Sequence, residues 1–283
     1  MNYAFHLVAL VTAYGILAIS QYVVLNRGGM VFAVQGALFG IGAYSAALAA
    51  MHGVPAVVAL AGGGVVAAAA TMPMALPSFR LQGDYLLVAS LGFCEIVRSL
   101  LNNLRVTGGA AGLAGIPQLR VFSMTLSGPA EFALAFVLVL VVYVLAWQRI
   151  EASPFGRLLH AMGEDAETTL ALGKNVQRVR VAVFVFTGLW TGLAGGLWAF
   201  YLRYLDPSAF TLWESVLVVA IAVAAGNHGI RGVLAACALM LMVPELLRFA
   251  GLPQSIGAPL RQIIFGSALV VTVRLHARQS RLS

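Results

Sequence analysis

The chain has 283 residues, of which 61% are hydrophobic and 10% charged, whereas soluble domains carry roughly 25% charged residues. This composition indicates a membrane protein and excludes a disordered chain. Cys94 and Cys237 are the two cysteines, and both lie in apolar runs, which excludes a disulfide-stapled secreted domain. The net charge of +7 does not indicate a nucleic acid partner, because the basic residues lie between apolar stretches and do not cluster with aromatic residues. Orientation in membrane lipid explains them better.

Apolar stretches of about 20 residues, the length that crosses the hydrocarbon core, follow one another along the chain. They predict an all-α, polytopic transmembrane helical bundle of about 8 to 10 membrane segments, forming a single domain over residues 1–283. The expected segments are 3–25, 28–50, 54–76, 84–102, 131–148, 179–202, 212–226, 232–248 and 258–275. Segments 28–50 and 212–226 are short or interrupted by glycine, so we expect one or two broken or re-entrant helices.

Lysine and arginine predict the orientation, because loops rich in these residues stay on the cytoplasmic side. The loop 149–178 carries Arg149, Arg157, Lys174 and Arg178, and the C-terminal tail carries Arg274, Arg278 and Arg281. Both regions are therefore expected in the cytoplasm. With nine crossings, the N-terminus would lie outside.

The longest connections are an outer loop over 103–130 and the cytoplasmic loop over 149–178, and we expect function to concentrate there. The outer loop contains Thr107, Gly108 and Gly109 at the start of a glycine-rich run, which favours irregular backbone and close approach between elements. The glycine-rich run is not a phosphate loop, because it contains no Gly-Lys pair followed by serine or threonine.

The Gly-Lys pair of the chain, Gly173-Lys174, lies in the cytoplasmic loop and is followed by asparagine. The Walker sequence is therefore absent, and no ATP hydrolysis is expected by that route.

The chain lacks the sequence patterns of common catalytic sites. It contains no His-Glu-x-x-His, Gly-x-Ser-x-Gly or Cys-x-x-Cys pattern, and the five histidines are scattered. We therefore expect no metal site and no enzyme.

Ionisable residues inside membrane segments are costly and therefore informative. Glu95 and Arg98, like Glu245 and Arg248, form Glu-x-x-Arg pairs, whose spacing places both side chains on one helical face. The pairs hint at an internal repeat and could face a translocation path. Alternatively, the arginines extend to the outer interface. Glu214, close to a helix start, is expected at the interface.

Small residues recur at helical spacing in two segments. They are Gly36, Gly40 and Gly42 in one, and Gly188, Gly192, Gly195 and Gly196 in the other. This spacing lets helix backbones approach closely in lipid, which favours a structural role. A second interpretation is that Gln35 and Tyr44 line a central path that the glycine packing keeps narrow.

The cytoplasmic loop predicts two short helices beneath the bundle. Residues 155–162 are amphipathic, and residues 163–173 can form a second helix that ends at the Gly173 cap. Glu164, Asp165 and Glu167 are expected in the first turn of that helix, the end that favours negative charge. Short exposed helices of this kind suit docking on another protein, although a solvated linker is the alternative.

These blocks together resemble the inner-membrane permease subunits of bacterial ABC importers for branched-chain amino acids, in particular the LivM-like branch. The matching blocks are Gly36–Ala47, Gly83–Arg98 leading to Thr107–Pro117, Phe155–Val176 and Val243–Arg248. They occur in the family's order and span most of the chain.

The resemblance implies a multi-pass subunit of the bacterial inner (plasma) membrane that forms half of a translocation path. Its implied partners are a second homologous permease, two cytoplasmic ABC ATPases that use the ATP, and an external solute-binding protein. The chain itself would bind no cofactor. The ATPase-coupling residues implied are Phe155, Gly156, Arg157, Glu164, Asp165, Glu167, Leu172 and Gly173; the path or helix-packing residues are Gln35, Gly40, Gly42, Tyr44, Glu95, Arg98, Thr107, Gly108 and Gly109.

The chain departs from the family pattern at several positions. Thr168, Thr169 and Gly163 stand where relatives commonly have paired alanines and an arginine, and residues 30–35 replace a usual Ser-Leu-Gly-His stretch. The solute could therefore differ from a branched-chain amino acid, and urea, short amides or aromatic acids are alternatives. A stand-alone secondary transporter that uses the Glu-x-x-Arg pairs is the competing class, but it would not need the docking helices of 153–175.

Overall fold

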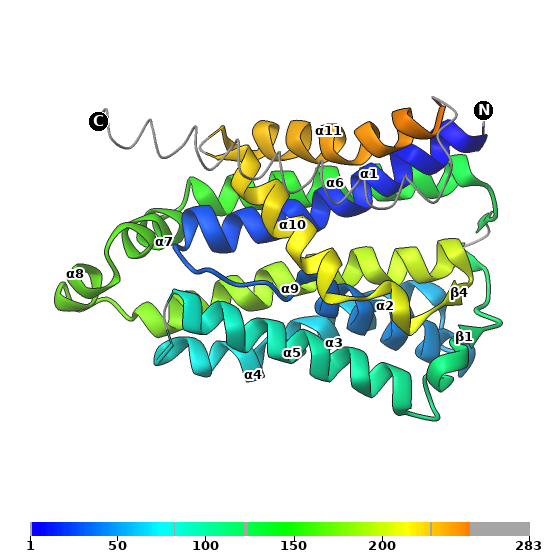
Figure 1. Cartoon of the computed structure of the whole chain (residues 1–283), viewed down its shortest axis with the longest axis horizontal. Coiled ribbons are helices and arrows are strands. Elements are labelled where there is room, and N and C mark those ends of the chain that lie inside the picture. Colours follow the sequence, from blue (N-terminus) through cyan, green and yellow to red (C-terminus); the bar gives the residue numbers. More distant parts are fainter. Residues whose placement is uncertain (1, 82, 122–123, 227, 250–283) are drawn as a thin grey trace.

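The computed structural model describes residues 2–81, 83–121, 124–226 and 228–249. The long helices lie side by side along the longest axis of the molecule (Figure 1). They are α1 (Asn2–Tyr22), α2 (Gln35–Met51), α3 (Ala56–Ala70), α5 (Asp84–Asn103), α6 (Pro129–Glu151), α9 (Val176–Leu202), α10 (Leu212–Ala225) and α11 (Gly229–Phe249). The short helices are α4 (Met72–Ala75), α7 (Pro154–Glu164) and α8 (Ala166–Ala171), with a π-helical turn η1 (Val23–Arg27) that extends α1 and 3₁₀ turns η2 (Pro77–Phe79), η3 (Gly109–Ala111) and η4 (Pro207–Ala209).

The helical bundle confirms the all-α prediction. Each predicted segment from 3–25 to 232–248 contains a helix, but residues 28–34 of segment 28–50 are not helical and segment 54–76 is divided between α3 and α4. Segment 258–275 lies outside the described residues. Within the described part of the chain, five helices could each cross a membrane by length and composition: Tyr3–Arg27, Ala56–Ala75, Pro129–Glu151, Val176–Leu202 and Pro207–Ala225. Helices Gln35–Met51 and Gly229–Met242 are apolar but shorter.

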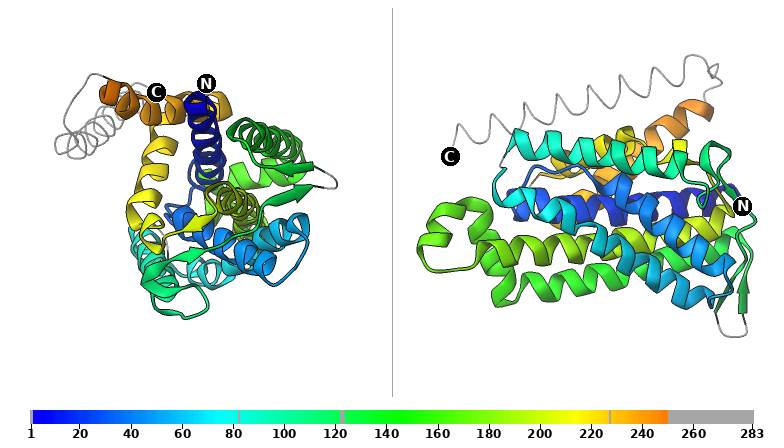
Figure 2. Two further views of the ribbon diagram at one scale, coloured as in Figure 1. Left: turned by 90° about the vertical axis from the view of Figure 1, so that its right-hand side faces the viewer. Right: turned by 90° about the horizontal axis from the view of Figure 1, so that it is seen from below.

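Helix α9 lies near the centre of the bundle when the molecule is seen along its long axis (Figure 2). It packs against α2 and α3 through small residues, as the glycine spacing predicts. A Cβ added at Gly42 of α2 would overlap the backbone of Gly192 on α9, and one added at Gly195 would overlap the carbonyl of Phe39. The three helices therefore approach at backbone distance, and glycine is required at these contacts.

The two ends of the bundle differ. Helices α7 and α8 project beyond the spanning helices at one end, whereas the N-terminus and the small strands lie at the other (Figure 1). The strands are β1 (Leu113–Ala114), β2 (Leu119–Val121), β3 (Met124–Leu126) and β4 (Tyr204–Leu205). β1 pairs antiparallel with β4, and β2 with β3. The glycine-rich run in 103–130 favoured irregular backbone, and strands this short gave no signal because they carry no alternation of apolar and polar residues.

Candidate functional site

The segment 28–50 is broken, because its first part is not helical. Residues 28–34, here called the strap, run as irregular chain from the end of η1 into the bundle, and α2 begins only at Gln35. Side chains supply the missing backbone partners: the Ala33 N–H donates to Ser90 Oγ at 3.0 Å, and Cys94 Sγ donates to the Ala33 carbonyl at 3.1 Å. The Gln21 Nε2 donates to the Phe32 carbonyl at 2.5 Å. Such backbone is tolerated at membrane depth where protein surrounds it.

The start of α2 meets the start of α10 inside the bundle. The Gly36 N–H donates to Ser215 Oγ at 3.0 Å, and Ser215 is buried. A Cβ at Gly36 would lie 2.8 Å from that oxygen, so the contact leaves no space for a larger residue. The N-terminal ends of two interrupted helices thus converge, as in transporters with discontinuous helices.

The residues proposed for path or packing on α2 are all engaged inside the protein. Gln35 is fully buried and accepts from Thr191 Oγ1 at 2.7 Å. Gly40 lies against the ring of Phe210, and Gly42 lies against α9. Tyr44 is buried and donates to the Leu205 carbonyl at 3.3 Å. Within this chain, these four positions pack helices.

Glu214 is half-buried between α10 and α1, a contact that the expectation of an interfacial residue did not include. It occupies the first turn of α10, and its carboxylate accepts from the hydroxyl of Tyr14 in the middle of α1. The sequence placed it near a helix start, but only the structure shows that this start is internal. The broken helix brings the carboxylate into the bundle.

We expect Tyr14→Phe to destabilise the protein by about 1–3 kcal/mol, because the partly buried Glu214 carboxylate loses its hydrogen bond. Thermal unfolding in detergent, followed by size-exclusion chromatography, measures this loss. An unchanged midpoint would show that the hydrogen bond does not stabilise the fold.

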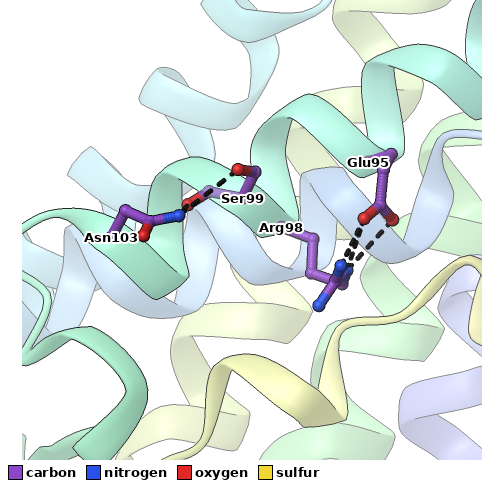
Figure 3. Close-up of polar contacts among 4 residues, drawn as sticks. All are labelled: Glu95, Arg98, Ser99 and Asn103. Carbon is purple, nitrogen blue, oxygen red and sulfur yellow. Dashed lines mark hydrogen bonds and ion pairs between the residues drawn. The ribbon is translucent and has the colours of Figure 1, made fainter.

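Glu95 and Arg98 form an ion pair on the outer surface of α5 (Figure 3). The Arg98 Nε lies 3.0 Å from both carboxylate oxygens of Glu95, and the side chains of Glu95 and Arg98 are 52% and 37% exposed. Ser99 and Asn103 extend the same polar face, with Asn103 Nδ2 donating to the Ser99 carbonyl at 2.8 Å. Glu95 is about 16 Å along the helix axis from Asp84, so the pair lies well inside the helix.

The opposite face of α5 is buried. Leu86, Ser90, Cys94, Val97 and Leu101 point to the core, where Ser90 and Cys94 hold the strap. Charged side chains facing hydrocarbon are costly, so the exposed polar face of α5 requires water or another protein.

Thr107, Gly108 and Gly109 close the end of α5. Thr107 is buried, and its hydroxyl donates to the carbonyls of Leu101 and Leu104 at 2.7 and 2.8 Å. Gly108 and Gly109 have φ of 82° and 57°, a region that favours glycine. The role of the block is local, because it satisfies carbonyls that a helix end leaves free.

Helix α7 lies against the bundle through one face. Ser153 caps its start by accepting from the Gly156 N–H at 3.4 Å, and Pro154 occupies the first turn. Its buried residues are Gly156, Leu159 and Met162. Phe155 is half-buried, whereas Arg157 is exposed and donates to the Ala152 carbonyl at 3.3 Å.

Helix α8 begins at Ala166, after the N-cap Asp165, which corrects the expected start at residue 163. Glu164 ends α7, where its carboxylate lies 3.7 Å from His160 Nδ1, and is not in the first turn of the second helix. Asp165 caps α8, and hydrogen bonds from the hydroxyl and the N–H of Thr168 lower its pKa. Glu167 lies in the first turn and Gly173 closes the end with φ of 75°, as predicted.

The far side of α8 exposes apolar residues. Leu170 and Leu172 are 62% and 74% exposed at the projecting end of the molecule. Sequence reasoning named Leu172 but missed Leu170; the signal was a pair of leucines within an otherwise polar loop. Among the described residues, no group of three or more His, Cys, Asp or Glu side chains could hold a metal ion.

Comparison with known proteins gives a consistent result. Residues 3–273 match the family described as the permease component of the branched-chain amino acid transport system. The chain is 32% identical over 260 residues to the high-affinity branched-chain amino acid transport system permease protein LivM of Escherichia coli (strain K12), an alignment that covers 83% of this chain and 61% of that protein. It is 26% identical over 251 residues to the L-arabinose ABC transporter permease protein AraH of Azospirillum brasilense, covering 86% of this chain and 71% of that one.

A shorter alignment, 29% identical over 137 residues, relates the chain to the probable branched-chain amino acid transport permease protein LivM of Methanocaldococcus jannaschii and covers 48% of this chain and 39% of that one. The chain thus spans 61% of the length of the Escherichia coli LivM protein, and no solved structure matches it. The match over residues 3–273 shows that this chain belongs to the family of branched-chain amino acid transport permease components.

Proposed function

We propose that the chain is a single permease domain that forms half of the translocation path of a bacterial ABC importer. Separate ATPase subunits use the ATP, and the solute is a branched-chain amino acid or a related small polar molecule. The family match and the relatives named as ABC transporter permeases support this role. The alternation of spanning helices with a projecting helical pair supports it as well.

The observation that carries the proposal is the exposed apolar surface of α8. Leu170 and Leu172 project beyond the spanning helices, on a segment that Asp165 and Gly173 hold in a defined shape. Exposed apolar residues in an aqueous segment favour a protein partner. We infer that α7 and α8 dock on a cytoplasmic ATPase, with Arg157, Glu164 and Glu167 at the polar rim and with Phe155 and Gly156 fixing α7 to the bundle.

The exposed polar face of α5 supports a place beside the path. It is costly for this face to contact hydrocarbon, because it carries Glu95, Arg98, Ser99 and Asn103. A second homologous permease would place a similar polar helix face opposite it. We infer that α5 faces the second subunit across a water-filled path. The Thr107-Gly108-Gly109 cap fixes the outer end of that helix.

The orientation follows from the same assembly. If α7 and α8 meet cytoplasmic ATPases, then residues 149–178 lie in the cytoplasm and the N-terminus lies outside the bacterial inner membrane. The outer end, which carries the β1–β4 and β2–β3 pairs, would then receive solute from an external binding protein.

The competing function is a stand-alone secondary transporter in which Glu95 and Arg98 couple an ion gradient to transport. It explains the ion pair but gives no role to the exposed leucines of α8. The importer explains both features.

Purification of the tagged chain from gently solubilised membranes tests the proposal. We expect a second permease and two ATPases in near-equal amounts, identified by mass spectrometry. In Leu172→Asp, ATPase recovery is expected to fall by about tenfold or more, because a charge replaces an apolar contact at the interface centre. Val106, which is 65% exposed at the opposite end, supplies the control: Val106→Asp should leave ATPase recovery unchanged. Equal ATPase recovery in Leu172→Asp and wild type would contradict the docking role, and a chain that purifies alone would contradict the importer.

A further inference from the structure

Helix α7 contacts the start of the strap through two glycines. A Cβ added at Gly29 would lie 2.6 Å from the Gly163 carbonyl oxygen and 3.0 Å from its Cα. A Cβ added at Gly163 would overlap the Arg27 carbonyl and lie 3.2 Å from the Gly29 nitrogen. The two backbones therefore touch, and no side chain fits between them.

The same end of the strap is fastened to the bundle and to α7 by other contacts. Arg27, the last residue of η1, forms an ion pair with Glu151 at the end of α6, with 2.6 Å between Nη2 and Oε1. Leu159, on the buried face of α7, lies 3.5 Å from the position of a Cβ on Gly28. A displacement of α7 thus acts on the strap directly.

The other end of the strap reaches the junction of the two broken helices. Ala33 is held by Ser90 and Cys94 of α5, and the Gly36 N–H donates to Ser215 of α10. Cys94 Sγ also lies 3.5 Å from Ser215 Oγ. Three elements, α2, α5 and α10, therefore meet where the strap ends.

The strap differs from a helix in the way it can respond to force. Its first residues bond to the backbone of η1, where the N–H groups of Gly28, Gly29 and Met30 donate to carbonyls of residues 23–25. Further along, Phe32 and Ala33 bond to side chains of α1 and α5, and these bonds can exchange without unwinding a helical turn. Seven residues reach at most about 25 Å when fully extended, which limits how far the two ends of the strap can separate. Close-packed interiors pass such displacements on.

We propose that the strap carries the movement of α7 to the junction of α2, α5 and α10, and that Gly29 and Gly163 are the positioning residues through which the movement enters. This inference rests on the proposed function, since it takes α7 and α8 as the ATPase-docking helices. When the ATPases close and displace α7, the strap transmits the displacement to α5, the helix that bears the Glu95–Arg98 face. Its movement would reposition that face relative to the second permease.

The test uses the complete complex reconstituted in vesicles with its binding protein, and measures labelled leucine taken up per ATP hydrolysed. Gly163→Ala keeps a helix-compatible residue but separates the two backbones. We expect an intact complex that still hydrolyses ATP, with uptake per ATP lower by about fivefold or more. Gly62→Ala is the matched control, because a Cβ at this helical glycine meets nothing within 4 Å, and it should behave as wild type.

A second variant guards against failure of Gly163→Ala to assemble. Ser90→Ala removes the partner of the Ala33 N–H at the far end of the strap, away from α7. We expect normal ATPase recovery and the same fall in uptake per ATP. An unchanged ratio in Ser90→Ala, or in an assembled Gly163→Ala complex, would overturn the inference alone. Absence of ATP-driven uptake in the wild-type complex, for leucine and for every other solute that its binding protein binds, would contradict the proposed function and the inference together.

Discussion

Gly42→Val is expected to prevent accumulation of folded protein in the membrane. A side chain at this position would overlap the backbone of Gly192, and the adjacent contact between Gly195 and Phe39 leaves α9 no room to retreat. Overpacking of a core typically costs about 1–3 kcal/mol and more where backbone must move. Because three central helices share this contact, we expect the cost to lie at or above about 3 kcal/mol.

Fluorescence-detected size exclusion of a tagged protein measures the fold directly. Gly42→Val should give an aggregated or absent peak, whereas Gly62→Val, at an exposed helical glycine with nothing within 4 Å, should give the wild-type peak. A symmetrical wild-type peak for Gly42→Val would mean that α2 and α9 do not pack as the structure shows.

Glu95→Ala is expected to lower solute uptake by about tenfold or more, because the path loses a charged group and Arg98 loses its partner. The exposed ion pair has two possible roles, one in the translocation path and one in stabilising the subunit. If the ion pair only stabilises the subunit, the loss arises from the unpaired Arg98, and removing both charges should repair it.

The double variant Glu95→Ala, Arg98→Ala therefore decides between the two roles. We expect folding, measured by the thermal midpoint, to return towards wild type, and uptake in the reconstituted complex to stay low. If uptake and folding both recover, the ion pair only stabilises the subunit, and α5 does not line the translocation path.

The spanning helices were predictable because length and apolar composition alone determine which segments cross a bilayer. Segments such as 131–148 and 179–202 lie within α6 and α9. The glycine contacts between α2 and α9 were also predictable, since small residues at helical spacing indicate close packing. The start of α2 was not predictable, because residues 30–34 are as apolar as a helix and the side chains of Ser90 and Cys94, which bond to Ala33, lie far along the chain.

The candidate site was only partly predictable from the sequence, because many of its contacts join residues far apart along the chain. Glu95 and Arg98 stood out as charges in an apolar segment, but the sequence could not show whether they face outwards. Glu214 was expected at the interface because it lies close to a helix start; its partner Tyr14 lies in another helix, so the sequence did not show the contact. Gly163 stood out as a departure from the family pattern, but its contact with Gly29 gave no signal, since a contact between distant glycines leaves no periodic pattern.

ATP-driven uptake by the purified complex in sealed vesicles tests the central claim most directly. The complex, with its binding protein and labelled leucine on the side of the N-terminus, should accumulate solute only when ATP is present on the side of α7 and α8. Leu172→Asp should abolish the ATP-driven uptake, because the ATPases no longer bind. Uptake by the chain alone, without ATP and driven by an ion gradient, would contradict the importer and establish secondary transport.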